Sequence, residues 1–220
     1  MQLLALLLPE RCAVCARPGT RLCAACRGAL VRLREPLCKR CGSPGPWPVR
    51  RCAECSGRRL AFAGARSAIV YDERARAFVR AWKEHGRRRL AADAAAIVAE
   101  VIPRPSVDAL AYVPGDPERA SRRGDVPPRS LAEELGRIWR IPVCGLLARS
   151  RSQPPQRGRS LAERRKNVRG AIDGTRPSPA LVCLVDDVYT SGATVDSCAS
   201  ALRKAGAARV EAVTLARAVR

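Results

Sequence analysis

The sequence contains no run of apolar residues close to the ~20 that a membrane-spanning helix needs, so we expect no membrane insertion. Aromatic residues make up only 4% of the chain, and the 47% of hydrophobic residues must therefore build a core mainly from alanine, leucine and valine. The apolar opening MQLLALLLPE has no basic leader and no small-residue cleavage site, so a signal peptide is not expected. These features together predict a cytoplasmic globular protein.

Acidic residues are also scarce compared with basic ones. Lys and Arg total 41 against 20 Asp and Glu, which gives a formal net charge of +21 at pH 7. A surface this basic attracts polyanions such as nucleic acid, phosphate-rich metabolites or anionic lipid. A solvated, Arg-rich face encoded by a GC-rich genome explains the same charge, and the composition leaves both explanations open. The 220 residues suffice for one ordinary domain and a small appendage.

The eleven cysteines are unevenly distributed, and eight of them form four C-x-x-C pairs in the first quarter of the chain. Two thiolates on such a tight turn can face one ion, and two turns complete a tetrahedral Zn²⁺ site with no open position. In a reducing compartment metal is the expected use, and a closed site supplies folding energy to a segment with little core. We therefore predict a module with two structural zinc ions in residues 1–60, with the ligands Cys12, Cys15, Cys23, Cys26, Cys38, Cys41, Cys52 and Cys55.

The sequence leaves two ways of combining the pairs. Neighbouring pairs can share an ion, or the first pair can combine with the third and the second with the fourth. We favour the sequential arrangement because each half then closes over a short loop. The isolated Cys144, Cys183 and Cys198 lie in apolar or helical contexts and are expected to be small core residues rather than nucleophiles.

Residues 61–220 show alternating strand and helix patterns. We expect strands at 66–71, 108–114, 142–147, 180–188 and 209–217, and helices at 72–86, 88–102, 129–139, 160–168 and 193–206. This alternation predicts an α/β domain with a mainly parallel sheet, in which ligands bind at the carboxyl ends of the strands. The strand at 180–188 is almost continuously apolar, so we expect it at the sheet centre, buried on both faces.

The stretch VCLVDDVYTSGAT, residues 182–194, joins an apolar strand to two adjacent acids, a hydroxyl-rich turn and a helix start. The turn offers three hydroxyls, and its glycine lets the backbone approach a ligand. The N-terminus of the following helix supplies N–H groups and the positive end of a dipole, which suits a single phosphate. Asp186 and Asp187 can accept hydrogen bonds from vicinal hydroxyls, so the pattern favours a ribose 5-phosphate over a solvated strand end with an ordinary turn.

The same stretch closely resembles the phosphoribosyl pyrophosphate (PRPP) motif of type I phosphoribosyltransferases. The resemblance implies that Asp186 and Asp187 are the catalytic acids and contact the ribose hydroxyls. It also implies that PRPP binds together with Mg²⁺, which offsets the charge of the pyrophosphate. The residues implied to cradle the 5-phosphate are Thr190, Ser191, Gly192, Ala193 and Thr194.

A wider set of motifs resembles the ComF/ComFC family of competence-associated proteins along nearly the whole chain. The motifs are the N-terminal cysteine module, AWKEHGR near residue 85, DALAYVP followed by RRG, and RSRSQPPQRGRSLAERRKNVRGAI before the PRPP motif. The resemblance implies a double zinc ribbon (1–60) joined to a phosphoribosyltransferase-like domain (61–220). It places Gly115 and Asp116 in a pyrophosphate loop and Lys83 in a Lys-x-x-Gly element. It further implies a role with single-stranded DNA and with DNA-uptake or recombination proteins.

The segment from Arg149 to Gly170 carries eight basic residues and one acid. In related transferases a mobile loop before the PRPP motif closes over the pyrophosphate, where bidentate arginine suits polyphosphate and closure excludes water. A solvated loop without this role is the alternative. The residues implied to belong to this flexible loop are Gln156, Arg157, Arg164, Arg165 and Asn167.

One motif departs from the family pattern. Residues 123–126 are RGDV, where the family commonly has Arg-Gly-Phe-Asn, so a base-stacking or amide contact is not predicted there and the acceptor is not specified. Our first hypothesis is a PRPP-binding protein of the phosphoribosyltransferase family that acts in natural competence, DNA uptake and handling of single-stranded DNA. A nucleic-acid-binding zinc adaptor with a vestigial PRPP pocket is the alternative. A nucleobase-salvage transferase ranks last, because nothing in the sequence defines a base pocket.

Overall fold

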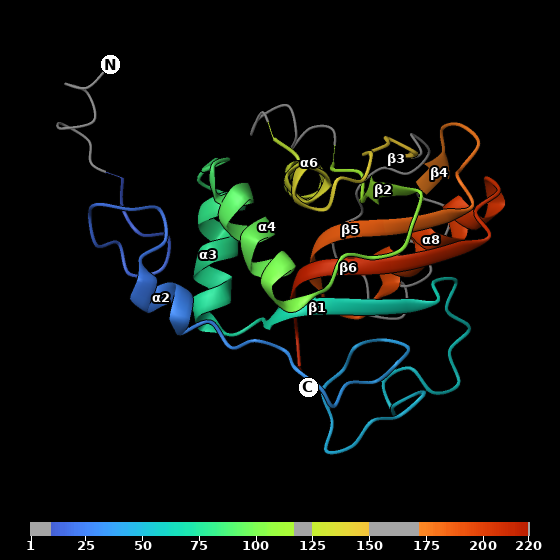
Figure 1. Cartoon of the computed structure of the whole chain (residues 1–220), viewed down its shortest axis with the longest axis horizontal. Coiled ribbons are helices and arrows are strands. Elements are labelled where there is room, and N and C mark those ends of the chain that lie inside the picture. The colour runs from blue at the N-terminus through green and yellow to red at the C-terminus, as the bar shows by residue number, and fades with distance from the viewer. Residues whose placement is uncertain (1–9, 117–124, 150–171, 220) are drawn as a thin grey trace, which may run out of the picture.

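The computed structural model describes residues 10–116, 125–149 and 172–219, and Figure 1 shows their arrangement. A four-stranded sheet with the order β1-β6-β5-β2 forms the centre, and a separate antiparallel pair, β3 and β4, lies beside it. The strands are β1 (Gly64–Val70), β2 (Ala109–Tyr112), β3 (Leu147–Arg149), β4 (Ile172–Gly174), β5 (Leu181–Tyr189) and β6 (Arg209–Arg217). The helices are α2 (Ala24–Gly28), α3 (Glu73–Lys83), α4 (Leu90–Val101), α6 (Pro127–Trp139) and α8 (Ala193–Lys204).

All strand pairs in the central sheet are parallel, because helical segments connect the successive strands. The registers pair Val182 of β5 with Val210 of β6 on one side and with Ala109 of β2 on the other. β5 lies between these two strands and is buried along almost its whole length, as its apolar run predicted. The predicted α/β class with a mainly parallel sheet is therefore confirmed, and the carboxyl ends of its strands meet at one edge.

Two apolar clusters cover the opposite faces of the sheet. Helices α3, α4 and α6 pack with Val185 and Val213 on one face, and α8 packs with Val182 and Leu184 on the other. Figure 1 shows α8 behind the sheet, α3 and α4 to the left of the strands, and α6 above them. Because neighbouring β5 side chains point to opposite faces, both clusters draw on the same strand.

Helix α3 shows agreement between local sequence signals and packing. Asp72 caps the helix, since its side chain accepts a hydrogen bond from the Ala75 N–H at 2.9 Å. Phe78 and Trp82 are both buried, because residues four apart in a helix lie on the same face and this face packs on the core. The helix ends at Lys83, and this end lies at the carboxyl edge of the sheet, where the Lys83 ammonium pairs with Asp187.

The strand expected at 142–147 is wrong in its position. Val143 forms only an isolated bridge with Leu110, and the regular strand β3 begins later and pairs with β4 instead. Pro142 has no N–H to donate to a ladder, and Gly145 lies against Tyr112, where a Cβ would be 3.0 Å from the hydroxyl oxygen. These two residues interrupt the pairing with β2. The helix expected at 160–168 lies outside the described residues.

The cysteine-rich segment joins the edge of the sheet through backbone contacts. Arg32 forms a bridge with Ile69 of β1, and the carbonyl of Arg40 accepts a hydrogen bond from the Ala65 N–H at 3.0 Å. Gly42, with φ +71°, approaches Ala65 so closely that a Cβ would lie 2.5 Å from its carbonyl oxygen. The domain boundary near residue 60 stays a prediction. In the part of the chain that the structure describes, no helix is long and apolar enough to cross a membrane.

Candidate functional site

The eight N-terminal cysteines form two clusters. Within each cluster the four sulfur atoms lie within 4.8 Å of one another, which is close enough for one tetrahedral ion to bind them all. The structure has the sequential grouping and not the crossed one. The first cluster is Cys12, Cys15, Cys23 and Cys26, and the second cluster is Cys38, Cys41, Cys52 and Cys55.

The surroundings of these sulfurs suit zinc-bound thiolates. The N–H of Cys23 donates to Cys12 Sγ at 3.5 Å, and the N–H of Cys26 donates to Cys23 Sγ at 3.4 Å. Burial disfavours the Cys12 thiolate, but backbone N–H donors outweigh it and lower the pKa of Cys12 to about 6. The same balance lowers the pKa of Cys38 to about 7. Burial and the neighbouring sulfurs raise the pKa of Cys26, Cys41 and Cys55, so four thiolates in one cluster require a cation between them. Four sulfur ligands leave no open position, so both sites hold structural zinc.

The other cysteines have a different environment. Cys183 in β5 and Cys198 in α8 are fully buried, and this burial raises the pKa of both thiols. Cys144 is half-buried. Cys183 and Cys198 are therefore core residues, as expected.

A cavity of about 440 Å³ opens at the carboxyl edge of the central sheet. Its walls come from the ends of β2, β5 and α3 and from the turn that leads into α8. Seven of the residues singled out from the sequence line it: Lys83, Gly115, Asp116, Asp186, Asp187, Thr190 and Thr194. The three remaining residues of the phosphate motif, Ser191, Gly192 and Ala193, form the turn beside the cavity without lining it.

The two acids in this cavity are buried side by side at the end of β5. Asp186 is 7% exposed and Asp187 6%. The N–H of Asp187 donates to Asp186 Oδ1 at 2.9 Å, and Asp187 Oδ2 lies 2.5 Å from the Nζ of Lys83. Burial, with the neighbouring Asp187 charge, raises the pKa of Asp186 to about 8. Buried carboxylates require hydrogen-bond donors or cations, so this pair suits a ligand that brings hydroxyls or a divalent ion.

The turn between β5 and α8 depends on glycine at position 192. Gly192 has φ +72°, and a Cβ there would lie 2.2 Å from the hydroxyl oxygen of Tyr189. Any other residue would be strained and would also clash. Helix α8 then begins at Ala193, whose N–H donates to Ser191 Oγ at 3.4 Å. The N-cap Gly192 has no side chain to accept further bonds, so other N–H groups of the first turn remain available to an anion.

Several residues that line the cavity were not among the predicted ligands, and two of them have specific contacts there. Arg149, at the end of β3, donates from Nε to the carbonyl oxygen of Pro114 at 3.3 Å. Val126, from the RGDV segment, packs on Gly115, where a Cβ would lie 3.0 Å from both of its γ-carbons. The only sequence signal for Arg149 was its place at the start of the Arg-rich segment. The flexible-loop residues Gln156, Arg157, Arg164, Arg165 and Asn167 lie outside the described residues.

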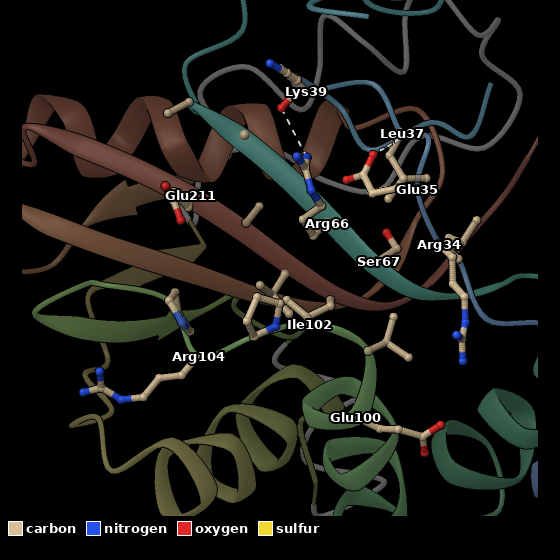
Figure 2. Close-up of a pocket in the computed structure, with 18 of the residues that line it drawn as sticks. Arg34, Glu35, Leu37, Lys39, Arg66, Ser67, Glu100, Ile102, Arg104 and Glu211 are labelled. Carbon is tan, nitrogen blue, oxygen red and sulfur yellow. Dashed lines mark hydrogen bonds between the residues drawn. The ribbon is translucent and has the colours of Figure 1, made fainter. Parts of the chain in front are cut away.

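A second hollow, which we call the edge groove, has a volume of about 620 Å³ and lies toward the amino ends of β1 and β6 (Figure 2). The walls are residues 33–39 on one side and residues 100–105 on the other. In Figure 2 Arg66 points from β1 toward Lys39, whose carbonyl oxygen accepts its hydrogen bond at 3.2 Å. Arg34, Arg104 and Arg209 add positive charge to the rim. The groove is therefore separate from the acid-lined cavity at the opposite ends of the strands.

Comparison with known protein families finds a match in the N-terminal part of the chain. Residues 3–57 match the double zinc ribbon domain. The remainder of the described chain combines a parallel sheet, an acid pair at the end of its central strand β5 and a glycine turn into α8. The protein class is thus a parallel α/β fold that carries a match to the double zinc ribbon domain.

Curated relatives match almost the full length of the chain. The DNA utilization protein YhgH of Salmonella typhi is 29% identical, over 96% of this chain and 99% of that protein. Competence protein ComFC of Bacillus subtilis is 27% identical over 91% of this chain and 86% of that protein, and Competence protein F of Haemophilus influenzae is 26% identical over 90% of each. The resemblance expected from the motifs is confirmed, because the chain is similar to ComFC and Competence protein F over most of its length.

Two solved structures resemble part of the chain. The allosteric regulatory enzyme of purine biosynthesis is 21% identical over 58% of this chain, with a TM-score of 0.41. The glutamine PRPP amidotransferase of B. subtilis is 22% identical over 59% of this chain, with a TM-score of 0.39. The chain spans about a quarter of the length of these enzymes, 25% and 26% respectively.

Proposed function

We propose that the cavity at the carboxyl edge binds PRPP or a related sugar phosphate together with Mg²⁺. The observation that carries this proposal is the buried pair Asp186 and Asp187 beside the glycine-led start of helix α8, at one cavity. Vicinal ribose hydroxyls supply the donors that two buried carboxylates need, and the helix N-terminus supplies N–H groups for the 5-phosphate. A ribose 5-phosphate is a ligand that brings both features.

Each predicted residue then has a distinct task in the proposed complex. Asp186 and Asp187 hold the ribose hydroxyls, and the turn from Thr190 to Thr194 holds the 5-phosphate. Gly115 and Asp116 lie where the pyrophosphate would extend, and Lys83 adds a positive charge close to it. Mg²⁺, held by the pyrophosphate and the cavity acids, would offset the charge of the ligand.

If the protein transfers the ribosyl group, a nucleophile displaces pyrophosphate from the anomeric carbon. The C–O bond to pyrophosphate breaks as the bond to the nucleophile forms, and positive charge develops on the sugar ring. The buried carboxylates would stabilise this charge, so the chain contributes positioning and electrostatics more than proton transfer. Arg149, beside the cavity, is suited to the departing pyrophosphate because a guanidinium can bond to phosphate oxygens bidentately.

Isothermal titration calorimetry with PRPP and Mg²⁺ tests this proposal. We expect the wild type to bind and the double variant Asp186→Asn/Asp187→Asn to lose binding. Asp173→Asn is the matched control, because Asp173 is an exposed acid on β4 outside the cavity. Equal binding by the wild type and the double variant, or no binding by the wild type, would contradict the proposal.

A second function, handling of single-stranded DNA during DNA uptake, is favoured by the names of the relatives and by the edge groove. Arg34 and Lys39 on its rim make no side-chain hydrogen bond or ion pair with the described part of the chain. Two of the three acids of the groove form ion pairs: Glu100 with Arg27 and Arg32, and Glu211 with Arg209. The third, Glu35, accepts a hydrogen bond from the Leu37 N–H at 2.6 Å and keeps its negative charge, against the cations Arg34, Lys39, Arg66 and Arg104. The residual charge is positive, and none of the described residues that line the groove is aromatic, so it suits a nucleic-acid backbone rather than stacked bases.

Fluorescence anisotropy with a labelled oligonucleotide tests this second function. We expect binding that weakens with salt, and a slope of log K against log salt that falls by about 0.7 for each phosphate contact removed in Arg34→Ala/Lys39→Ala. Arg74→Ala/Arg137→Ala is the matched control, because it removes the same charge from α3 and α6. Binding that is unchanged in the groove variant, or equally reduced in both variants, would exclude the groove as the DNA site.

A further inference from the structure

Arg217, at the end of β6, is fully buried and nevertheless charged. Its Nη1 donates to the carbonyl oxygen of Cys41 at 2.7 Å, and its Nη2 donates to Glu54 Oε2 at 2.6 Å. The same Nη2 lies 3.8 Å from Cys41 Sγ. A buried guanidinium requires such partners. Both hydrogen-bond acceptors belong to the two C-x-x-C turns of the second cluster, which we call its knuckles. Cys41 is one of the zinc ligands, and Glu54 lies beside another, Cys55.

The other side of this guanidinium contacts the floor of the phosphate turn. The Cζ of Arg217 lies 4.5 Å from the centre of the Tyr189 ring, a cation–π contact. Tyr189 is 2% exposed, and its hydroxyl lies directly under Gly192. Tyr189 is thus held between Arg217 and the turn, so a change in the position of Arg217 is transmitted to the turn by direct contact.

The segment that follows the second cluster holds the same turn from another direction. Arg58, three residues after the last zinc ligand, donates from Nη1 to the carbonyl oxygen of Ser191 at 2.8 Å. The N–H of Ala61 donates to Asp196 Oδ1, in the first turn of α8, at 2.7 Å. The turn and the start of α8 therefore depend on the second ribbon for two further hydrogen bonds.

The first cluster provides an internal contrast. Its ribbon contacts α4 through the ion pairs of Arg21 with Asp93, at 3.0 Å, and of Arg27 with Glu100, at 2.7 Å. Within the described residues, no hydrogen bond or ion pair joins this ribbon to the phosphate turn. The two zinc sites have the same ligand chemistry but different neighbours.

We propose that the second zinc cluster, through Arg217 and Tyr189, sets the conformation of the sugar-phosphate turn, so that affinity for a sugar phosphate depends on zinc in this cluster and not in the first. This inference rests on the proposed function for its ligand. Zinc keeps the two knuckles together, and the knuckles keep the partners of Arg217 in position. When the knuckles separate, the guanidinium loses its acceptors and the support under Gly192 is lost.

Hydrogen exchange of the full-length protein tests the coupling without any ligand. We compare Cys52→Ser, in the second cluster, with Cys23→Ser, a matched substitution in the first cluster, and confirm by metal analysis that each loses zinc from its own site. We expect the amides of residues 190–196 to exchange faster in Cys52→Ser and at the wild-type rate in Cys23→Ser. The amides of α4 serve as the reference for global unfolding. Equal exchange of the turn in the two variants would overturn the coupling.

Variants that keep all eight thiols separate the coupling from loss of the ribbon itself. In Glu54→Gln and Arg217→Met the zinc ligands remain, so zinc content should stay at the wild-type value while the turn exchanges faster. Calorimetry should show PRPP affinity falling roughly 10- to 100-fold in both, with partial rescue in Arg217→Lys, since misplacement of a binding group costs this much. Unchanged exchange and unchanged affinity in these variants would contradict the role of Arg217. A wild type that binds no PRPP would remove the proposed function, while the exchange measurement would still decide the coupling.

Discussion

Lys83 Nζ lies 2.5 Å from Asp187 Oδ2, and this ion pair joins the end of α3 to the acid pair at the end of β5. The carboxylate is almost completely buried, with its side chain 8% exposed, while the lysine side chain is 30% exposed. The contact links two motifs that are 104 residues apart in the chain. It also explains how two adjacent acids can be accommodated at a buried strand end, because one of them is neutralised from the neighbouring helix.

Substitution Lys83→Met should destabilise the protein by about 1–3 kcal/mol, because it leaves a buried carboxylate without its cation beside a second acid. Urea unfolding measures this effect. Arg80→Met is the matched control on the same helix, since Arg80 pairs with Glu84 at 3.5 Å and both side chains are more than half exposed. That variant should lose less than about 1 kcal/mol. Equal losses of unfolding free energy in the two variants would show that the Lys83–Asp187 pair stabilises the protein no more than an exposed ion pair does.

The raised pKa of Asp186, about 8 in the fold, predicts that stability falls as pH rises. Below about pH 4 both the folded and the unfolded chain hold this proton, whereas between about pH 4 and pH 8 only the folded chain holds it. The free energy of unfolding should therefore decrease across this window, by at most about 1.4 kcal/mol per pH unit from this group.

Urea unfolding at intervals between about pH 5 and pH 8 measures this slope. Asp186→Asn should flatten it, because an amide has no proton to release in this range. The exposed control Asp173→Asn should keep the wild-type slope. A slope that survives in Asp186→Asn would assign the pH dependence to other groups.

Substitution Gly192→Ala should abolish sugar-phosphate binding and destabilise the turn, because the new methyl group would lie 2.2 Å from the Tyr189 hydroxyl oxygen. Gly57→Ala is an unusually close control, since Gly57 has the same φ of +72° but no heavy atom within 4 Å of the added carbon. The control should lose only the ~1–2 kcal/mol of left-handed backbone strain. Calorimetry and thermal unfolding of the two variants measure the difference. Retained binding in Gly192→Ala would contradict the tight turn.

Native mass spectrometry should find two zinc ions in each chain, because the two clusters each hold four thiolates. Cys15→Ser and Cys38→Ser should each lose one ion, and the double variant should lose both. The crossed arrangement of pairs would give the same count for each single variant. It would differ in the variant that lacks both Cys15 and Cys26, which should lose one ion in the sequential arrangement and two in the crossed one.

Most of the fold could be predicted from the sequence because its signals are local. The cap at Asp72, the spacing of Phe78 and Trp82 and the apolar run of β5 each lie within a few residues of the structure they determine. The prediction of a strand at 142–147 was wrong because Pro142 and Gly145 interrupt its pairing with β2. Local propensity does not include the contacts that a segment makes with a neighbouring strand. In the candidate site, Arg149 was missed as a cavity residue because only the approach of β3 to the turn after β2 brings it there.

The sequence by itself determined the eight zinc ligands, most of the strands and helices around the central sheet, and the turn of hydroxyls and glycine that follows the acid pair. Each of these is a short pattern whose chemistry depends on neighbours in the chain. Only the tertiary structure decided which groups from distant parts of the chain come into contact. Lys83 pairs with Asp187, and Arg217 bonds to Cys41, 176 residues away. Such contacts depend on how helices and ribbons pack on the sheet, and no local spacing encodes a buried charge whose partner lies at the other end of the chain.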